Sequence, residues 1–118
     1  MDFKKQKPIY LQIADTLCER IVAKEWESED RIPSVRDVAA ELGVNPNTVL
    51  RTFDHLQQNE IIYNRRGLGY FVAENAVERI LNIQREYFLN EEIPTVLQRM
   101  RMLGITINDL RVIAENQH

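Results

Sequence analysis

The sequence predicts a mainly α-helical fold with one small β-hairpin. Two short amphipathic helical patterns within residues 33–59 are separated by Leu42, Gly43 and Val44, and this break has the right length for the tight turn of a helix-turn-helix. Two runs rich in isoleucine, tyrosine, phenylalanine and valine follow within residues 61–72, with glycines and arginines between them. Together these patterns predict a winged helix-turn-helix domain over residues 1–73 and a short helical segment over residues 74–118.

The first helix is expected over residues 9–23. Residues 1–7 are polar, contain three lysines and form a predicted arm that leads into Pro8, a residue that suits a helix start. Isoleucine or leucine recurs at every fourth position of the helix, which gives it an apolar face that packs on the helix-turn-helix. The single cysteine, Cys18, is expected to be a small buried residue on that face, and Tyr10 is expected to have a packing role.

The second helix has a capping signature at its start. Ser34 is the expected N-cap, and Asp37 three residues later completes a capping box. The N–H groups of such a helix start also favour a phosphate. Arg36 falls in the first turn, where a contact with a DNA backbone and a salt bridge with a nearby carboxylate are both open.

The third helix is the predicted reading element. Asn45 is a good N-cap, and Pro46 fits the first helical position because its missing N–H costs nothing there. At helical spacing, Val49, Phe53 and Leu56 fall on the packing side. The opposite side carries side chains that can meet base edges and phosphate oxygens, namely Asn47, Thr48, Arg51 and His55. An ordinary solvated helix face is the alternative interpretation.

The predicted hairpin has a cationic tip. Arg65 and Arg66 are placed where a phosphate or a minor groove would be, and Gly67 and Gly69 permit positive φ and a close backbone approach. A tip that only aids solubility is the alternative. Beside a helix-turn-helix, the pattern favours a wing that contacts double-stranded DNA.

The motifs in these elements carry a family resemblance. The runs concerned are Ile32-Pro33-Ser34-Val35-Arg36, Asp37-Val38-Ala39-Ala40-Glu41-Leu42-Gly43-Val44, Thr48-Val49 and Gly67-Leu68-Gly69-Tyr70-Phe71-Val72. Over roughly residues 8–73 they resemble the winged-helix domain of the GntR family of bacterial transcription regulators. The resemblance implies that Arg36 contacts DNA. The tail is similar to that of the YtrA subfamily, which has a small helical dimerisation segment in place of a large effector domain.

The sequence departs from the family pattern at two places. Lys24 and Glu29 stand where the family usually has glycines, so the loop over residues 24–31 is expected to be built differently or to stay helical for longer. Asn59-Glu60 replaces the usual acidic-glycine step at the end of the third helix, and we expect Asn59 to take the left-handed conformation there. Trp26 is expected to cover the edge of the core, with stacking on a ligand as the minority alternative.

Three further helices are expected after residue 73. The first runs from about residue 76 to 89, Asn90 caps the second through residue 103, and Thr106 with Asp109 forms a capping box for the third, which ends near residue 116. Pro94 is acceptable in the first turn of its helix.

The apolar faces of these helices need a partner, because about 45 residues cannot enclose much of a private core. A second copy of the chain is the simplest candidate, and packing back onto the same winged helix is the alternative. A homodimer predicts a pseudo-palindromic operator. The candidate dimerisation residues are Ile80, Leu81, Tyr87, Phe88, Val96, Leu97, Met100, Leu110 and Ile113.

Composition and charge limit which other classes of protein this chain can belong to. The 118 residues carry a net charge of −3, which says little about DNA because local cations, not the total, meet phosphates. No apolar run has the length of a membrane span, and a cytoplasmic protein without a membrane partner is expected. We predict no enzyme, cofactor or metal site, since no nucleophile with a base, carboxylate pair or phosphate-cradling glycine loop is present. A small-molecule effector of unknown identity and a role as a protein-interaction module both stay open.

Overall fold

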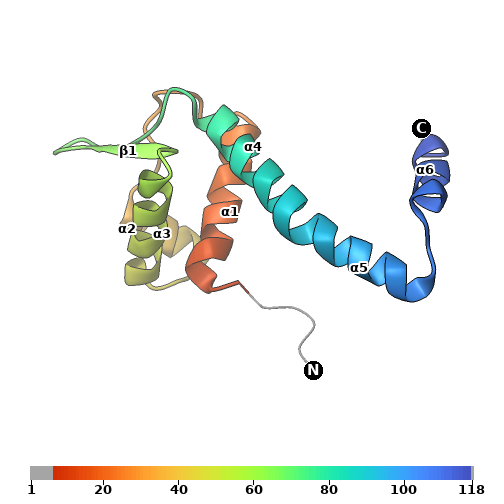
Figure 1. Ribbon diagram of the computed structural model, residues 1–118. Helices are drawn as coiled ribbons and strands as arrows, with labels where there is room; N and C mark the ends of the chain where they lie inside the picture. The colour runs from red at the N-terminus through yellow and green to blue at the C-terminus, as the bar shows by residue number, and fades with distance from the viewer. Residues whose placement is uncertain (1–6, 118) are drawn as a thin grey trace. The chain divides into compact units, whose positions relative to one another are not determined.

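The computed structural model describes residues 7–117, so most of the expected N-terminal arm lies outside the described residues. The chain divides into two compact units, Met1–Leu81 and Asn82–His118 (Figure 1). The first unit is a winged helix-turn-helix and the second is helical, so the predicted fold class is confirmed.

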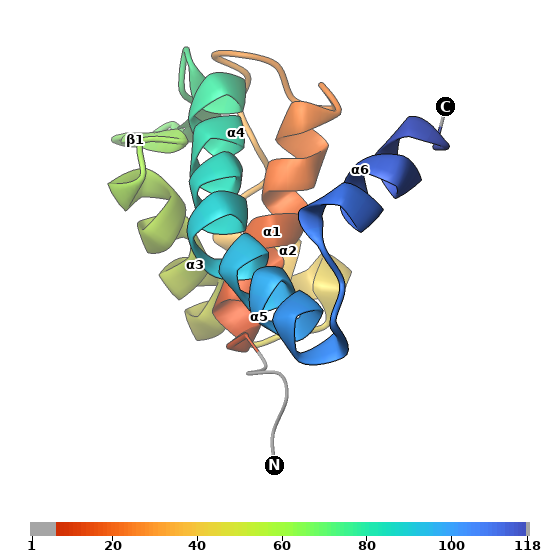
Figure 2. The same ribbon diagram turned by 45° about the vertical axis from the view of Figure 1, so that its right-hand side comes forward.

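Three helices form the body of the first unit. They are α1 (Ile9–Val22), α2 (Val35–Leu42) and α3 (Pro46–Gln58). Helix α3 packs against both α1 and α2 (Figure 2). The apolar faces predicted by helical spacing meet in one core, to which α1 contributes Leu17 and Ile21, and α3 contributes Val49, Phe53 and Leu56. Cys18 is also buried there, as predicted.

The predicted caps are present at both helices of the helix-turn-helix. The Ser34 hydroxyl accepts from the N–H of Asp37 at 3.1 Å, and the Asp37 carboxylate accepts from the N–H of Ser34 at 3.3 Å. At α3, the side-chain oxygen of Asn45 accepts from the N–H of Asn47 at 2.7 Å. Gly43 between the two helices has a φ of 68°, which a glycine adopts at little cost. The starts of both helices and the end of α2 therefore lie where the local sequence sets them.

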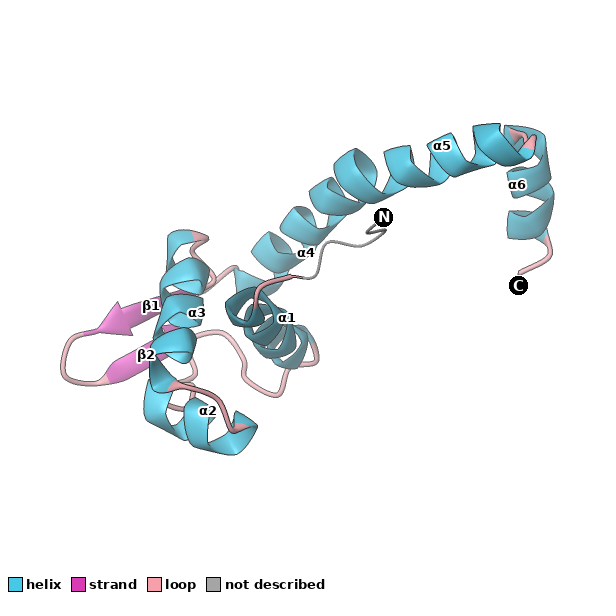
Figure 3. Cartoon of the chain, turned by 90° about the horizontal axis from the view of Figure 1, so that it is seen from below, coloured by secondary structure: helices cyan, strands magenta, loops and turns pink. Residues whose placement is uncertain are grey.

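The wing is a two-stranded antiparallel hairpin beside α3 (Figure 3). Strand β1 (Ile62–Arg65) pairs with β2 (Gly69–Val72) in a register that places Ile62 opposite Val72 and Arg65 opposite Gly69. Ile62 and Val72 are buried in the core. The hairpin is thus anchored at the end near the helices, while its tip is exposed.

The loop after α1 corrects one expectation. We expected a different build at Lys24 and Glu29, but they have φ values of 64° and 70°, which is the conformation that glycines would take. The N–H of Lys24 bonds to the carbonyl of Ile21 at 3.0 Å, and the N–H of Glu25 bonds to that of Arg20 at 2.9 Å. These bonds form a Schellman motif with Lys24 at the position usually held by glycine. The prediction was wrong because the surrounding hydrogen bonds hold the backbone shape without the glycine.

The end of α3 corrects a second expectation. Asn59 has a φ of −90°, and Glu60 takes the left-handed conformation instead, with a φ of 59°. Asn59 continues the helical turn, and its side-chain amide donates to the carbonyl of His55 at 2.9 Å. The reversal of the chain therefore comes one residue later than predicted.

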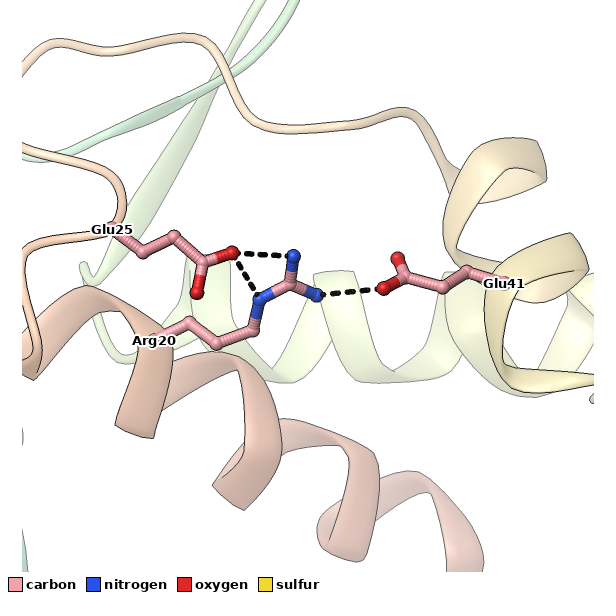
Figure 4. A network of polar contacts seen from close by, with 3 residues as sticks. All are labelled: Arg20, Glu25 and Glu41. Atoms are coloured by element: carbon pink, nitrogen blue, oxygen red, sulfur yellow. Dashed lines mark hydrogen bonds and ion pairs between the residues drawn. The ribbon is translucent and has the colours of Figure 1, made fainter.

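An ion-pair network ties α1 to the loop and to α2 (Figure 4). Arg20 donates to one carboxylate oxygen of Glu25 from Nε at 2.9 Å and from Nη2 at 2.7 Å, and it reaches Glu41 of α2 at 3.5 Å. Its hydrogen bonds to Glu25 are the main reason that the pKa of the guanidinium is raised. The same guanidinium lies over the Trp26 ring, 4.3 Å from the centroid. Trp26 packs against the core, as predicted.

The remaining helices follow the wing. They are α4 (Ala76–Tyr87), a π-helical turn η1 (Phe88–Glu92), α5 (Ile93–Leu103) and α6 (Ile107–Glu115). The predicted capping box is present at α6, where Thr106 and Asp109 exchange hydrogen bonds of 2.9 and 3.2 Å. Gly104 ends α5 with a φ of 71°.

The expected helix start at Asn90 is absent, because Asn90 lies inside η1. Pro94 lacks the N–H that an α-helix would direct to the carbonyl of Asn90, and its ring crowds that carbonyl. A π-helical turn relieves this conflict, and in it the N–H of Ile93 bonds five residues back to the carbonyl of Phe88. Proline therefore widens the helix here instead of ending it.

Candidate nucleic-acid interface

The first turn of α3 presents the polar side chains predicted for it. Asn45 and Asn47 are exposed, and Thr48 is half-buried. The cap fixes the backbone at this end, so these side chains start from a rigid position. Amide and hydroxyl groups can both donate and accept hydrogen bonds, as base edges require.

One turn further along α3, Arg51 rests on an aromatic ring from another helix. Its guanidinium carbon lies 4.0 Å from the ring centroid of Tyr10 in α1. His55 meets the same ring edge-on, with the centroids 6.0 Å apart. A cation over an exposed aromatic ring is stabilised by about 0.5–1 kcal/mol. Tyr10 therefore holds Arg51 in place at the surface, beyond the packing role expected for that tyrosine.

Arg36 is exposed in the first turn of α2, next to the capped start of the helix. Two interpretations were open for it, a DNA contact and a salt bridge. Within residues 7–117 no acidic side chain forms an ion pair with Arg36. Its guanidinium is thus free of an internal counter-charge, as a phosphate contact needs.

The tip of the wing is a tight turn. The N–H of Leu68 bonds to the carbonyl of Arg65 at 2.8 Å, and Gly67 has a φ of 79°, as the third residue of a type II turn requires. Arg65 and Arg66 are exposed, and neither forms an ion pair with a described residue. The turn therefore presents two uncompensated positive charges.

Aromatic side chains line the solvent face of the hairpin. Tyr63 and Phe71 stand opposite each other, with ring centroids 5.9 Å apart, and the guanidinium of Arg65 lies 5.3 Å from the Phe71 centroid. The Tyr63 hydroxyl donates to the carboxylate of Glu29, and this bond is the main cause of the raised pKa of Tyr63. The ring of Phe71 restrains Arg65, and the bond from Tyr63 to Glu29 ties the hairpin to the loop before α2.

Two residues that support the candidate interface were not assigned to it from the sequence. Tyr10 was assigned to packing alone, although it carries Arg51. Thr52 was not considered, and its buried hydroxyl donates to the carbonyl of Tyr10 at 2.6 Å, which joins α3 to α1. A threonine between Val49 and Phe53 on an apolar face was the signal for such a bond.

The candidate dimerisation residues differ in exposure. Ile80 is only 2% exposed within the core of the first unit, and Met100 is 8% exposed, so neither offers a free surface. Leu97 is half-buried. The others are exposed, and they are Leu81, Tyr87, Phe88, Val96, Leu110 and Ile113.

The family model for bacterial regulatory proteins of the gntR family matches residues 9–72. The chain belongs to this family. The GntR-family chain is 39% identical over 108 residues to an uncharacterized HTH-type transcriptional regulator, YhcF, of Bacillus subtilis strain 168, covering 92% of this chain and 88% of that relative. It is 36% identical over 110 residues to the HTH-type transcriptional repressor YtrA of the same organism, covering 93% of this chain and 84% of the repressor.

A solved structure agrees over nearly the whole chain. The crystal structure of a GntR-family regulator from Bacteroides thetaiotaomicron is 42% identical, covers 92% of this chain and 94% of its own, and superposes with a TM-score of 0.82. The similarity to short, YtrA-like GntR proteins is thus confirmed, and it extends beyond the wing into the C-terminal helices.

Membership of the GntR family makes this chain a DNA-binding transcription regulator and not an enzyme. Burial raises the pKa of the Cys18 thiol to about 12, so the thiol is a poor nucleophile at neutral pH. Within residues 7–117 no three His, Cys, Asp or Glu side chains gather as metal ligands would. No helix in the described part of the chain is long and apolar enough to cross a membrane.

Proposed function

We propose that this regulator is a cytoplasmic homodimeric repressor that binds a pseudo-palindromic operator. The observation that carries the proposal is the exposed polar end of α3, with Arg51 resting on Tyr10, in one unit with a wing whose tip arginines have no internal counter-charge among the described residues. The printed name of the relative YtrA supports repression as the sign of regulation.

Helix α3 would enter the major groove with its first turns leading. Asn47, Thr48 and Arg51 would meet bases and phosphates there, with Asn45 and His55 at the margins of the contact. Ser34 and Arg36 at the start of α2 would bind the adjacent backbone, where N–H groups and a cation both favour a phosphate. The wing around Arg65, Arg66, Gly67 and Gly69 would reach the neighbouring minor groove.

The dimer would form through the segment of residues 74–118. Its described part exposes many large apolar side chains, including Tyr87, Phe88, Val96, Leu110 and Ile113, each at least 43% accessible. Monomeric proteins rarely leave so much apolar surface in water, and a second copy would cover it. Two winged helices about one DNA turn apart would then read two half-sites.

The test is selection of bound duplexes from a random DNA pool at near-physiological salt, followed by sequencing. We expect a two-fold symmetric motif with a fixed half-site spacing, which supports the DNA contact and the dimer together. Enrichment of a single half-site would support the DNA contact and contradict the dimer. If a folded sample enriches nothing, the operator proposal fails and a protein-interaction module becomes the better explanation.

A further inference from the structure

We propose that Arg31 is a further DNA-contacting residue, and that with Arg65 it binds backbone phosphate beside the wing. Arg31 lies outside the motifs that carry the family resemblance and outside the predicted site. The inference rests on the proposed placement of the wing against DNA, and it adds a residue from the loop before α2.

The backbone of Arg31 is fixed along the free edge of the hairpin. Arg31 forms an antiparallel bridge with Phe71 of β2. On either side of it, the N–H of Ile32 bonds to the carbonyl of Tyr70 at 3.0 Å, and the N–H of Val72 bonds to the carbonyl of Asp30 at 2.9 Å. The loop is thus paired with β2 at a single bridge, and this backbone pairing sets the position of Arg31 relative to the wing.

The side chain of Arg31 runs over Gly69. A Cβ placed on Gly69 would lie 3.0 Å from Nε and 3.4 Å from Nη2 of Arg31, closer than ordinary van der Waals contact. The missing side chain at Gly69 therefore leaves the space in which the guanidinium rests. Gly69 was predicted to permit positive φ and a close approach to the backbone; its φ is 119°, and the Arg31 side chain approaches it.

Arg31 and Arg65 share the solvent face of the sheet. Residues paired across antiparallel strands point to the same face, and so do residues two apart along a strand. Phe71 is the partner of Arg31 and Gly69 is the partner of Arg65, which puts both arginines on the face that carries Phe71. Both are exposed, and neither forms an ion pair with a described residue.

The chemistry of this face fits a phosphate. The carboxylate of Glu29 accepts the hydroxyl of Tyr63 on this face, and among the described residues it forms no ion pair with Arg31 or Arg65. Two guanidiniums with planar sets of N–H donors, one resting on glycine and one on an aromatic ring, are restrained before a ligand arrives. Such groups bind phosphate oxygens with charge-assisted hydrogen bonds at reduced entropic cost.

The test measures how binding of a mixed-sequence DNA duplex depends on salt, by fluorescence anisotropy. Arg31→Met keeps a long stem over Gly69 and removes the charge, Arg31→Lys restores the charge, and Arg99→Met removes an exposed arginine of α5 as the control. We expect Arg31→Met to weaken binding and to reduce the slope of log K against log salt by about 1, with Arg31→Lys near the wild-type slope. Arg99→Met should match wild type.

A wild-type slope for Arg31→Met would overturn the inference, and an accompanying loss of thermal stability would show that Arg31 only packs against the wing. If the wild-type chain binds no duplex at any salt, the proposed operator binding fails and this inference fails with it. The two failures are distinguishable because the first leaves wild-type binding intact.

Discussion

Three non-glycine residues, Lys24, Glu29 and Glu60, hold a backbone conformation that glycine adopts at less cost, with φ between 59° and 70°. For a residue with a Cβ this costs about 1 kcal/mol or more. The carboxylate of Glu29 accepts the hydroxyl of Tyr63, and the carboxylate of Glu60 pairs with Arg79 at 3.6 Å. Lys24 differs because no side-chain bond of its own compensates the strain among the described residues. It is therefore the position where glycine should help most.

We expect Lys24→Gly to raise the free energy of unfolding by about 0.5–1 kcal/mol. Glycine removes the strain energy of the left-handed conformation, and this gain is larger than the entropy cost of fixing a more flexible residue on folding. The neighbouring Ala23 has a φ of −74°, so Ala23→Gly is the matched control and should lower the free energy of unfolding by a similar amount. Urea denaturation of the three proteins measures both. Equal destabilisation by the two substitutions would show that the positive φ of Lys24 carries no strain.

The seat of Arg51 on Tyr10 leads to a prediction about DNA affinity. Arg51→Ala should weaken binding to the selected operator duplex by about 1–3 kcal/mol if Arg51 makes a bidentate base contact, and by less if it touches phosphate. Arg51→Lys separates the cases, since lysine keeps the charge but loses the planar pair of donors. Titrations of the three proteins with one duplex give the comparison. Equal affinities for wild type and Arg51→Ala would remove Arg51 from the interface.

At the scale of elements, helix α3 is docked on α1 by apolar contacts and by a hydrogen bond from Thr52. The Thr52 hydroxyl, fully buried, donates to the carbonyl of Tyr10 at 2.6 Å. The ring of Tyr10 in turn supports Arg51, so this bond links α3 to the residue on which its arginine rests. The docking of α3 and the pose of its side chains are therefore coupled.

Replacing Thr52 by valine tests that bond. The two side chains have nearly the same shape, so the change removes the hydroxyl and leaves the packing, and we expect a loss of about 0.5–1.5 kcal/mol of stability. Thr16→Val is the control, because within residues 7–117 the exposed hydroxyl of Thr16 bonds only to the carbonyl of Gln12 in its own helix, at 3.2 Å. Thermal unfolding should place Thr16→Val close to wild type. If both variants unfold alike, the bond between α1 and α3 contributes nothing of its own.

The features of this fold that can be predicted from the sequence are those that depend on residues close together in the chain. The Ser34–Asp37 and Thr106–Asp109 boxes and the Asn45 cap act within a few residues of the chain, and all three are present in the structure. Glu60 and Lys24 escape prediction because hydrogen bonds around them impose a shape that their side chains disfavour. The contacts of Arg51 with Tyr10 and of Arg31 with Gly69 join distant segments, which no periodicity reveals.

At the scale of the whole molecule, the second unit has little buried apolar surface to stabilise it. Among its described apolar side chains Met100 is buried, whereas Met102, Leu103 and Ile107 are 64–77% accessible. So small a helical unit buries too little apolar surface to be stable by itself. Association with a second copy would supply the missing burial, and folding of this segment would then depend on protein concentration.

Val96→Glu places a charge on α5 at a side chain that is 44% accessible, within the proposed dimerisation surface. In an isologous dimer each substitution occurs twice, so two carboxylates would lose water together, and we expect the variant to dissociate at concentrations where wild type is dimeric. Sedimentation velocity over a dilution series gives the masses, with Gln98→Glu on the same helix as the control for added charge. Leu110→Glu repeats the test on α6. If both variants keep the wild-type mass, the interface lies elsewhere; if wild type itself sediments as a monomer at every concentration, the operator must be read one half-site at a time.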